Sequence, residues 1–562
     1  MQHAIHLGQK TCDEFALHLC LHLFQQLLHM FEVAVLRTAV FADRVRAIRG
    51  SLFPLAADET PGLTGFRAVA AIGAAAGQHL TRAWRGLDRH RKVSLAAMVA
   101  LSAGAIAVRA WLIFGYGQAF LGFRDSSIYV AQAGFGSVFG VQKPAGYPIF
   151  LKVVHVLSDD LGFTILVQHA LGLATGVVLY KAVRRTDAPP WLGLVPAAIV
   201  FFGGTGLLLE HALLADTPFA FVQAVAVYAA VRALKEPGRR WPLLAGLAIG
   251  VSFWLKTVGL ASALLVPALL LFAAPGTRRR RVQGAATCAL AVIGIVFAYV
   301  AAQALVTGYV GYERQGAWNL YGRVSTFVDC SKFTPPKGTQ FLCPAEPPSH
   351  RSSQFFFQYD PASPAVRRFG PPTKAPRTAN ALLQRFSIAA IEHEPAAYVG
   401  AVLRGLTFYV DPRFGEGYTP ESLREALLDR ERSNFIGPDI AVYYPHYRAY
   451  IGHSAKMIHS LANYERHTRV QGALLVVLLV AAIVGAPLLT GRTRSAAILF
   501  TLTAIVSATL AVAGNTYDAR YAYPAFGPLV AGAALGAWGV ATRLRQEVQR
   551  RWSGPRARKI AT

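Results

Sequence analysis

The sequence predicts an all-α polytopic membrane protein, and three observations support this fold class. The chain has 562 residues, of which 54% are hydrophobic and only 15% are charged, whereas a soluble domain carries about 25% charged residues. Apolar segments of span length recur along the chain, because about 20 apolar residues cross the hydrocarbon core of a bilayer. Lys and Arg gather in alternate short connections between these segments, which is the positive-inside pattern.

About ten transmembrane helices are expected from these apolar segments. The stretch 241–274 is flanked by Arg clusters at both ends, so we expect it to cross twice, as a tight hairpin with its outer tip near Lys256. The predicted spans are 93–115, 163–183, 190–209, 217–234, 241–255, 258–274, 284–306, 471–490, 496–513 and 522–543.

The basic clusters define the cytoplasmic side of what we expect to be the plasma membrane, with both termini inside. The net charge of +26 is explained by this topology, and no nucleic-acid-binding motif accompanies it. The outer side then carries the loop 116–162, the turn 210–216, the long segment 307–470 and the turn 515–521. We therefore expect lipids, and no nucleic acid, as partners of this surface.

Five regions follow from this topology. Residues 1–92 form a cytoplasmic or interfacial N-terminal extension, in which 16–40 is expected as an amphipathic interfacial helix. Residues 93–306 form a transmembrane module with its first outer loop at 116–162. The segment 307–470 is long enough for a mixed extracytoplasmic domain. Residues 471–543 form the C-terminal transmembrane helices, and 544–562 form a basic cytoplasmic tail.

Two of the five cysteines, Cys330 and Cys343, lie close together in the long outer segment. A disulfide is permitted outside the cytoplasm, so we predict one between them, with two free thiols as the alternative. An odd and small number of cysteines excludes a disulfide scaffold.

Charged residues at the outer ends of spans are the candidates for chemistry. Asp125 follows the first span, and either acts as a general base or serves as a solvated loop acid or helix N-cap. Lys143 begins a rigid turn with two prolines, which either enters a helix or holds a phosphate. Lys256 either snorkels to the headgroups or grips a lipid phosphate.

Two further outer turns carry ionisable residues. Arg520 stands at the outer end of the last span, where it either pairs with Asp518 or binds phosphate oxygens as a fork. Glu210, His211 and Asp216 cluster within seven residues, which suits an acceptor region or a divalent metal, while Asp216 could also cap the span that follows. The sequence assigns no cofactor and leaves a divalent metal open.

Together these motifs resemble the membrane glycosyltransferases of the GT-C superfamily, in particular the branch of protein O-mannosyltransferases and aminoarabinose transferases. The resemblance covers roughly residues 95–310 and 470–540. Its motifs, in chain order, are Asp125, the Lys143-Pro-Ala-Gly-Tyr147 turn, Asp216 in Ala215-Asp-Thr-Pro-Phe219, the hairpin from Gly246 through Lys256 to Leu260, and Arg520, Tyr521 and Pro524. Gln142 departs from the pattern, because the aminoarabinose branch has a metal-holding Glu there.

The resemblance implies an enzyme that moves a hexose or pentose from a polyprenyl-phosphate donor to an extracytoplasmic acceptor, which is a glycan, a lipid or a protein. Asp125 would be the base, and Lys143, Lys256 and Arg520 would hold the donor phosphate. A secondary transporter or a non-catalytic membrane scaffold is the alternative. A transporter favours two related halves and short outer loops, whereas this chain has a long outer segment and no sequence repeat.

Overall fold

The computed structural model describes residues 89–117, 119–121, 123–140, 142–411, 419–428, 438–447 and 455–553. The expectations for residues 1–88 and for the end of the basic tail lie outside these residues. The chain divides into two compact units, 1–99 and 100–562, and Asp125 with its neighbours belongs to the second. The described residues form helices, and their one isolated β-bridge joins Phe120 to Ala212.

Six described helices are long and apolar enough to cross a membrane, and a bent helix pair raises the number to seven. The remaining predicted spans coincide with shorter helices, namely α10 (Asp216–Ala233), α11 (Arg240–Leu255) and α12 (Ala261–Ala273). The all-helical membrane fold is confirmed, while ten crossings stay a prediction. The six helices cover Lys92–Tyr116, Leu161–Val183, Arg278–Thr307, Lys456–Leu488, Gly491–Gly514 and Ala519–Arg550.

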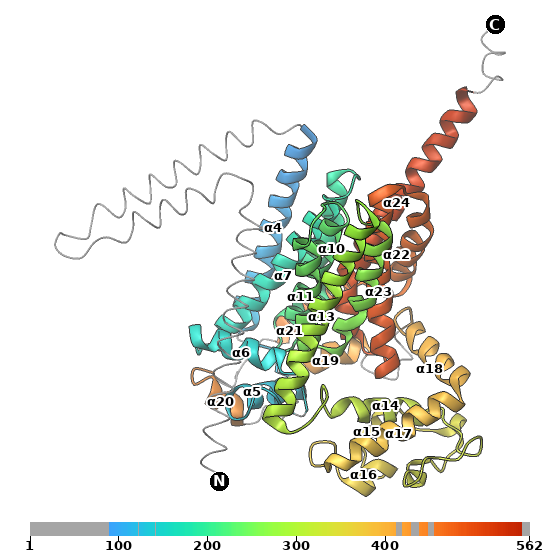
Figure 1. Ribbon diagram of the computed structural model, residues 1–562. Helices are drawn as coiled ribbons and strands as arrows, with labels where there is room; N and C mark the ends of the chain where they lie inside the picture. Colours follow the sequence, from blue (N-terminus) through green and yellow to red (C-terminus); the bar gives the residue numbers. More distant parts are fainter. Residues whose placement is uncertain are drawn as a thin grey trace, which may run out of the picture. The chain divides into compact units, whose positions relative to one another are not determined.

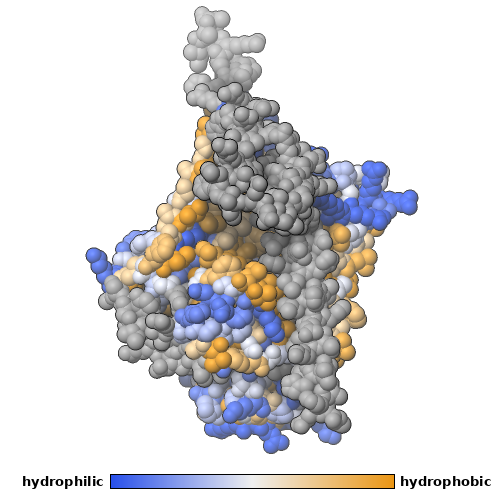
Figure 2. Space-filling model, turned by 90° about the vertical axis from the view of Figure 1, so that its left-hand side faces the viewer, coloured by the Kyte–Doolittle hydropathy of each residue, from blue (hydrophilic) through white to orange (hydrophobic). Residues whose placement is uncertain are grey.

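The long helices pack side by side in the second unit. α11 lies between α10 and α13 (Arg278–Thr307), while α24 (Tyr523–Ser553) packs against α22 (Gly472–Gly485) and α23 (Gly491–Gly514) (Figure 1). Large apolar side chains remain exposed on the spans, including Phe114, Leu264 and Leu305 at 87%, 85% and 80%. On the face in Figure 2, hydrophobic residues gather around mid-height beside a hydrophilic patch, and hydrophilic residues gather at the lower end. These exposed side chains suit contact with lipid tails.

The third predicted span is broken at Gly203. α8 (Leu194–Phe202) and α9 (Gly204–Glu210) meet there at an angle of 56°. A break in a helix leaves carbonyl groups without intrahelical partners, which is costly inside a membrane. Arg109 Nη1 donates to the Phe201 carbonyl at 2.9 Å, and the Tyr464 hydroxyl donates to the Phe202 carbonyl at 2.8 Å. The break therefore persists because two side chains replace the lost helical bonds.

The described part of the outer segment is helical, where we expect a mixed domain. It contains α14 (Gln315–Ser325), α15 (Gln354–Tyr359), α16 (Pro364–Phe369), α17 (Arg377–His393) and α18 (Pro395–Thr407). The helical stretch expected at 380–410 is interrupted where Pro395 begins α18, because proline cannot supply an interior helical N–H. A separate apolar core holds these helices together, formed by residues such as Trp318, Tyr321, Phe357, Leu383 and Phe386.

A disulfide joins Cys330 to Cys343 in this outer segment, with the two Cα atoms 6.1 Å apart. Both sulfurs lie against the apolar core of the segment. The remaining described cysteine, Cys288, is a buried thiol in α13. The bond closes the Pro-rich loop that leads from α14 towards α15.

Replacing both bridged cysteines, Cys330→Ser with Cys343→Ser, is expected to destabilise the outer segment by about 3 kcal/mol, because the bridge restricts the unfolded loop. Thermal unfolding of the purified protein, with and without a reducing agent, measures the effect. The wild type should lose stability on reduction, and the double variant should already be destabilised and ignore the reductant. Identical unfolding of both proteins under oxidising conditions would contradict a stabilising bridge.

Candidate functional site

Asp125 lies in the first turn of α5 (Arg124–Gly134), directly after the loop that leaves the first span. The N-cap position is Phe123, and no side chain caps the helix, so Asp125 is not the cap. Its carboxylate instead binds two cations: the Lys143 ammonium at 2.7 Å and the Arg520 guanidinium at 2.8 Å. The side chain keeps 16% of its exposure, so the ion pairs remain partly open to a ligand.

Lys143 is brought to Asp125 by the turn that precedes α6 (Gly146–Leu157). A Cβ at Gly146 would lie 2.5 Å from the Trp254 carbonyl oxygen, so only glycine allows the turn to approach the end of α11 this closely. The Tyr299 hydroxyl accepts a hydrogen bond from the Ala145 amide at 3.3 Å. The turn is therefore held by its contacts with α11 and α13.

Arg520 arrives from the short helix Ala519–Ala522 that precedes α24. It binds Asp125 and also approaches Asp518, whose Oδ2 lies 3.4 Å from Nε. The pairing with Asp518 thus exists but does not occupy the whole guanidinium. The Nη1 atom is buried and has no hydrogen-bond partner among the described residues. This leaves a donor available for an anionic ligand.

Lys256 forms the second ion pair of the site. Its ammonium lies 2.5 Å from the Asp216 carboxylate, which is only 1% exposed. Lys256 stands where α11 ends, and Asp216 begins α10 without capping it, because the N-cap is Ala215. The Tyr521 ring lies 5.3 Å from both the Lys256 ammonium and the Arg520 guanidinium. This ring joins the two ion pairs into one site.

Burial and charge set the protonation states of the site. Burial alone would raise the pKa of Asp125, but Lys143 and Arg520 outweigh it and hold that pKa well below its ordinary value. Burial would lower the pKa of Lys143, but Asp125 outweighs it, so this pKa is raised. Burial raises the pKa of Asp518 to about 6, against the opposing charge of Arg520. Without a ligand, Asp125 is therefore an ionised acid neutralised by two cations.

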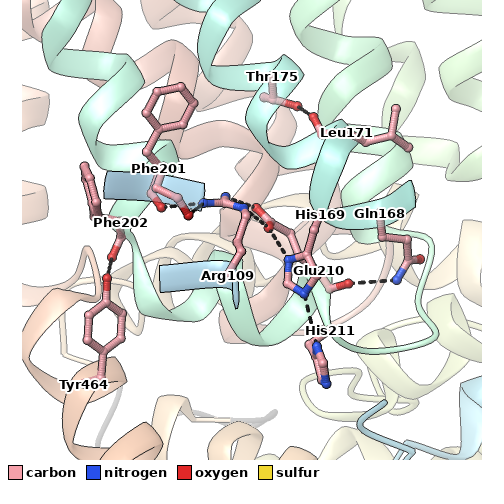
Figure 3. A network of polar contacts seen from close by, with 11 residues as sticks. Arg109, Gln168, His169, Leu171, Thr175, Phe201, Phe202, Glu210, His211 and Tyr464 are labelled. Carbon is pink, nitrogen blue, oxygen red and sulfur yellow. Dashed lines mark hydrogen bonds and ion pairs between the residues drawn. The ribbon is translucent and has the colours of Figure 1, made fainter. Parts of the chain in front are cut away.

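Glu210 and His211 do not join this site, although we expect them in an acceptor or metal region with Asp216. Both side chains are fully buried. Arg109 binds the Glu210 carboxylate with two hydrogen bonds of 2.7 and 2.8 Å, and His169 Nδ1 lies 2.8 Å from the same carboxylate (Figure 3). His169 Nε2 in turn lies 3.1 Å from His211 Nδ1. These groups therefore bind one another inside the protein.

The same buried network supports the loops that carry the site. Gln168 donates to the carbonyl groups of Glu210 and Ala212 at 2.9 and 2.8 Å, and its own oxygen accepts from the Tyr147 hydroxyl at 2.8 Å. The Phe120 amide donates to the His211 carbonyl at 2.9 Å. One set of contacts thus ties together the turn after Lys143, the turn before Asp216 and the loop before Asp125.

The metal hypothesis receives no support from the part of the chain that the structure describes. No group of three or more His, Cys, Asp or Glu side chains there could hold a metal ion. The carboxylates of the predicted metal region already form ion pairs, Glu210 with an arginine and Asp216 with a lysine. Gln142, in place of an acid before Lys143, agrees with this arrangement.

Sequence reasoning overlooked Arg109, Gln168 and His169, which lie inside predicted spans. The signal was present, because an ionisable residue inside a span is by default a functional or structural partner of another polar group. It also overlooked Glu313, whose pKa burial raises to about 7, with the charge of Lys143 opposing the rise and that of Asp125 adding to it. No local pattern marks Glu313, since it follows Gly311 and Tyr312 in an irregular loop.

One family model matches the part of the chain that contains Lys143, Asp216 and Lys256. Residues 142–303 match the family model described as dolichyl-phosphate-mannose-protein mannosyltransferase. In this part the chain is similar to membrane glycosyltransferases of the GT-C type. The matched part of the chain starts one residue before Lys143 and includes Asp216 and Lys256. Asp125 and Arg520 lie outside it, and Asp125 binds both Lys143 and Arg520.

No curated protein matches this sequence. Among solved structures, the apo oligosaccharyltransferase of Archaeoglobus fulgidus superposes with a TM-score of 0.39 and 13% sequence identity. The superposition covers 81% of this chain and 52% of that enzyme. This chain therefore spans about half the length of that protein.

Proposed function

We propose that the protein transfers a sugar from a polyprenyl-phosphate donor to an acceptor outside the membrane, with Asp125 as the general base. The observation that carries this proposal is the convergence of Lys143 and Arg520 on Asp125, with Lys256 also within 5.3 Å of the Tyr521 ring that Arg520 approaches. Cations that neutralise an acid in the resting site are also suited to bind a phosphate and to stabilise the charge that develops on it as it leaves.

Donor binding would change the state of Asp125. A phosphate that binds Lys143 and the available Nη1 donor of Arg520 competes with Asp125 for these cations. Their effect on the carboxylate then weakens, so its pKa rises towards the ordinary value and it becomes a better proton acceptor. The base would therefore be activated only when the donor is in place.

The reaction has one bond-forming and one bond-breaking event at the anomeric carbon. The acceptor oxygen attacks this carbon while its proton passes to Asp125. The bond from the carbon to the phosphate oxygen breaks, and its electron pair stays on the phosphate, where Lys143, Arg520 and Lys256 stabilise it. A single base with no carboxylate nucleophile implies inversion of configuration.

The regions of the chain receive roles in this proposal. The outer segment 307–470 would close over the sugar and select the acceptor, which is a glycan, a lipid or a protein. The lipid tail of the donor would lie among the spans at 93–306 and 471–543. The enzyme would reside in the plasma membrane with both termini in the cytoplasm, as the basic connections indicate.

A panel of radiolabelled polyprenyl-phosphate hexoses and pentoses, offered to the purified enzyme in lipid vesicles, tests the proposal. Transfer to an acceptor, or hydrolysis of one donor, is expected and identifies the sugar. Lys143→Ala should raise the KM for that donor by about 10- to 100-fold, the value of a charged hydrogen bond.

Lys337→Ala is the matched control, because Lys337 is an exposed lysine of the outer segment. Its donor KM should equal that of the wild type. Failure of every donor to bind or react would contradict a polyprenyl-phosphate sugar transferase. An unchanged donor KM in Lys143→Ala would remove this lysine from the phosphate site.

A further inference from the structure

Side chains of the outer segment hold the end of α23 from which the chain enters the candidate site. The last carbonyl groups of a helix lack intrahelical partners. Arg323 of α14 donates through Nη2 to the Val512 carbonyl and through Nε to the Asn515 carbonyl, both at 2.8 Å. The Tyr398 hydroxyl of α18 donates to the Ala513 carbonyl at 3.1 Å. Helices of the outer segment therefore fix the backbone at this end of α23.

The side chain of Asn515 is held by two glutamines of α15. Gln354 Nε2 donates to Asn515 Oδ1 at 2.7 Å, and Gln358 Nε2 donates to the same atom at 3.4 Å. Both glutamines are buried. A Cβ at Gly322 of α14 would lie 2.7 Å from Gln358 Cγ and 2.9 Å from Gln354 Cγ, so glycine leaves the space that the glutamines occupy. The packing of α14 on α15 thus places the two donors against Asn515.

These contacts decide which way the Asn515 amide points. Gln354 Nε2 also donates to the Asn319 carbonyl at 3.2 Å, and a carbonyl group can only accept. The nitrogen of Gln354 therefore faces Asn515, and the Asn515 oxygen must face Gln354. This leaves Asn515 Nδ2 to donate to the Tyr521 hydroxyl at 3.2 Å. A chain of hydrogen bonds thus runs from α14 and α15 through Asn515 to Tyr521.

Tyr521 provides the ring that two cations of the site share. The Lys256 ammonium and the Arg520 guanidinium each lie 5.3 Å from the ring centre, within the range of a cation–π contact. Tyr521 is only half-buried, so the hydrogen bond from Asn515 adds to the packing that holds the ring. The position of the hydroxyl therefore helps to set where the ring meets both cations.

We propose that Asn515 is a positioning residue of the donor-phosphate site, through which α14 and α15 orient the Tyr521 ring against Lys256 and Arg520. This inference rests on the proposed binding of a polyprenyl phosphate at these cations. The effect of Asn515 passes through the Tyr521 hydroxyl. The outer segment then contributes to donor binding as well as to the choice of acceptor.

Asn515→Ala tests this role, because it removes the donor to the Tyr521 hydroxyl and keeps the backbone carbonyl that Arg323 binds. One neutral hydrogen bond is lost. The Kd of radiolabelled polyprenyl phosphate in lipid vesicles, and the KM of the donor identified in the panel, should therefore rise by about 2- to 10-fold. The kcat at saturating donor should change by less, since the proposed base is kept.

Asn463→Ala is the matched control, because Asn463 is an exposed asparagine of α21 (Ala455–Thr468), and it should keep the wild-type Kd and KM. Tyr521→Phe keeps the ring, removes the hydroxyl and should raise the Kd at least as much as Asn515→Ala. In the Tyr521→Phe background, Asn515→Ala should have no further effect, because the contact is already lost. Effects that multiply, or an unchanged Kd in either single variant, would overturn the positioning role.

The outcomes also separate this inference from the proposed function. Transfer by the wild type with an unchanged Kd in Asn515→Ala would overturn the positioning role and leave the proposed reaction intact. Weaker binding of polyprenyl phosphate to Asn515→Ala than to the wild type, without transfer from any donor, would support the role and remove the reaction. Failure of polyprenyl phosphate and of every donor to bind the wild type would overturn both.

Discussion

Asp125→Asn is expected to lower the rate of sugar transfer by about 10²–10⁴-fold, the usual contribution of a general base. Asparagine keeps the shape of the side chain but cannot accept the proton of the acceptor. It also stops competing with the donor phosphate for Lys143 and Arg520, which bind Asp125 at 2.7 and 2.8 Å. Donor binding should therefore be equal to that of the wild type or tighter, while kcat falls.

Transfer and donor binding are best measured separately, on the same preparations, with Asp159→Asn as the control. Asp159 is an exposed acid between α6 and α7 (Leu161–Val183), so it tests the loss of an outer carboxylate without touching the ion pairs. A wild-type rate in Asp125→Asn would exclude Asp125 as the base. A lower rate that came entirely from weaker donor binding would make Asp125 a positioning residue for the two cations.

Arg109→Leu is expected to lower the free energy of unfolding by about 3–5 kcal/mol, because it leaves a buried carboxylate without its cation. Arg109 is 3% exposed and Glu210 is fully buried, so water cannot replace the lost bonds. The Phe201 carbonyl at the helix break loses its donor as well. Equilibrium unfolding in mixed detergent micelles measures the loss.

Arg385→Leu serves as the control for Arg109→Leu, since Arg385 is an exposed arginine of α17. The double replacement Arg109→Met with Glu210→Met should recover much of the stability, because an apolar pair leaves no uncompensated charge. A loss below about 1 kcal/mol in Arg109→Leu would indicate an exposed, weak pair and contradict the buried network. Transfer activity should fall with stability, because the network supports the loops that carry Asp125 and Lys143.

The helix pattern was predictable to within a few residues. The spans expected at 93–115 and 163–183 correspond to Arg89–Tyr116 and Leu161–Val183, because apolar length is a local property that the bilayer selects. The break at Gly203 was not predictable in the same way. Its stability depends on Arg109 and Tyr464, which are 92 residues and 262 residues away from the carbonyl groups they satisfy.

The candidate site was likewise predictable from the sequence only in part. Asp125, Lys143, Lys256 and Arg520 could be singled out because charged residues at span ends conflict with a purely structural role. Their pairing could not, since Arg520 and Asp125 are 395 positions apart. Glu210 and Asp216 illustrate the converse. They are neighbours in the sequence, yet one binds an arginine inside the first span and the other binds the lysine at the hairpin tip.

By itself, the sequence determined the membrane class, the approximate spans and the residue types of the site, because hydrophobic length and charge placement are read locally along the chain. Only the tertiary structure decided which acid meets which cation. The physical reason is that pKa values and ion pairs depend on distance and burial in space. These quantities arise when helices from distant parts of the chain pack together.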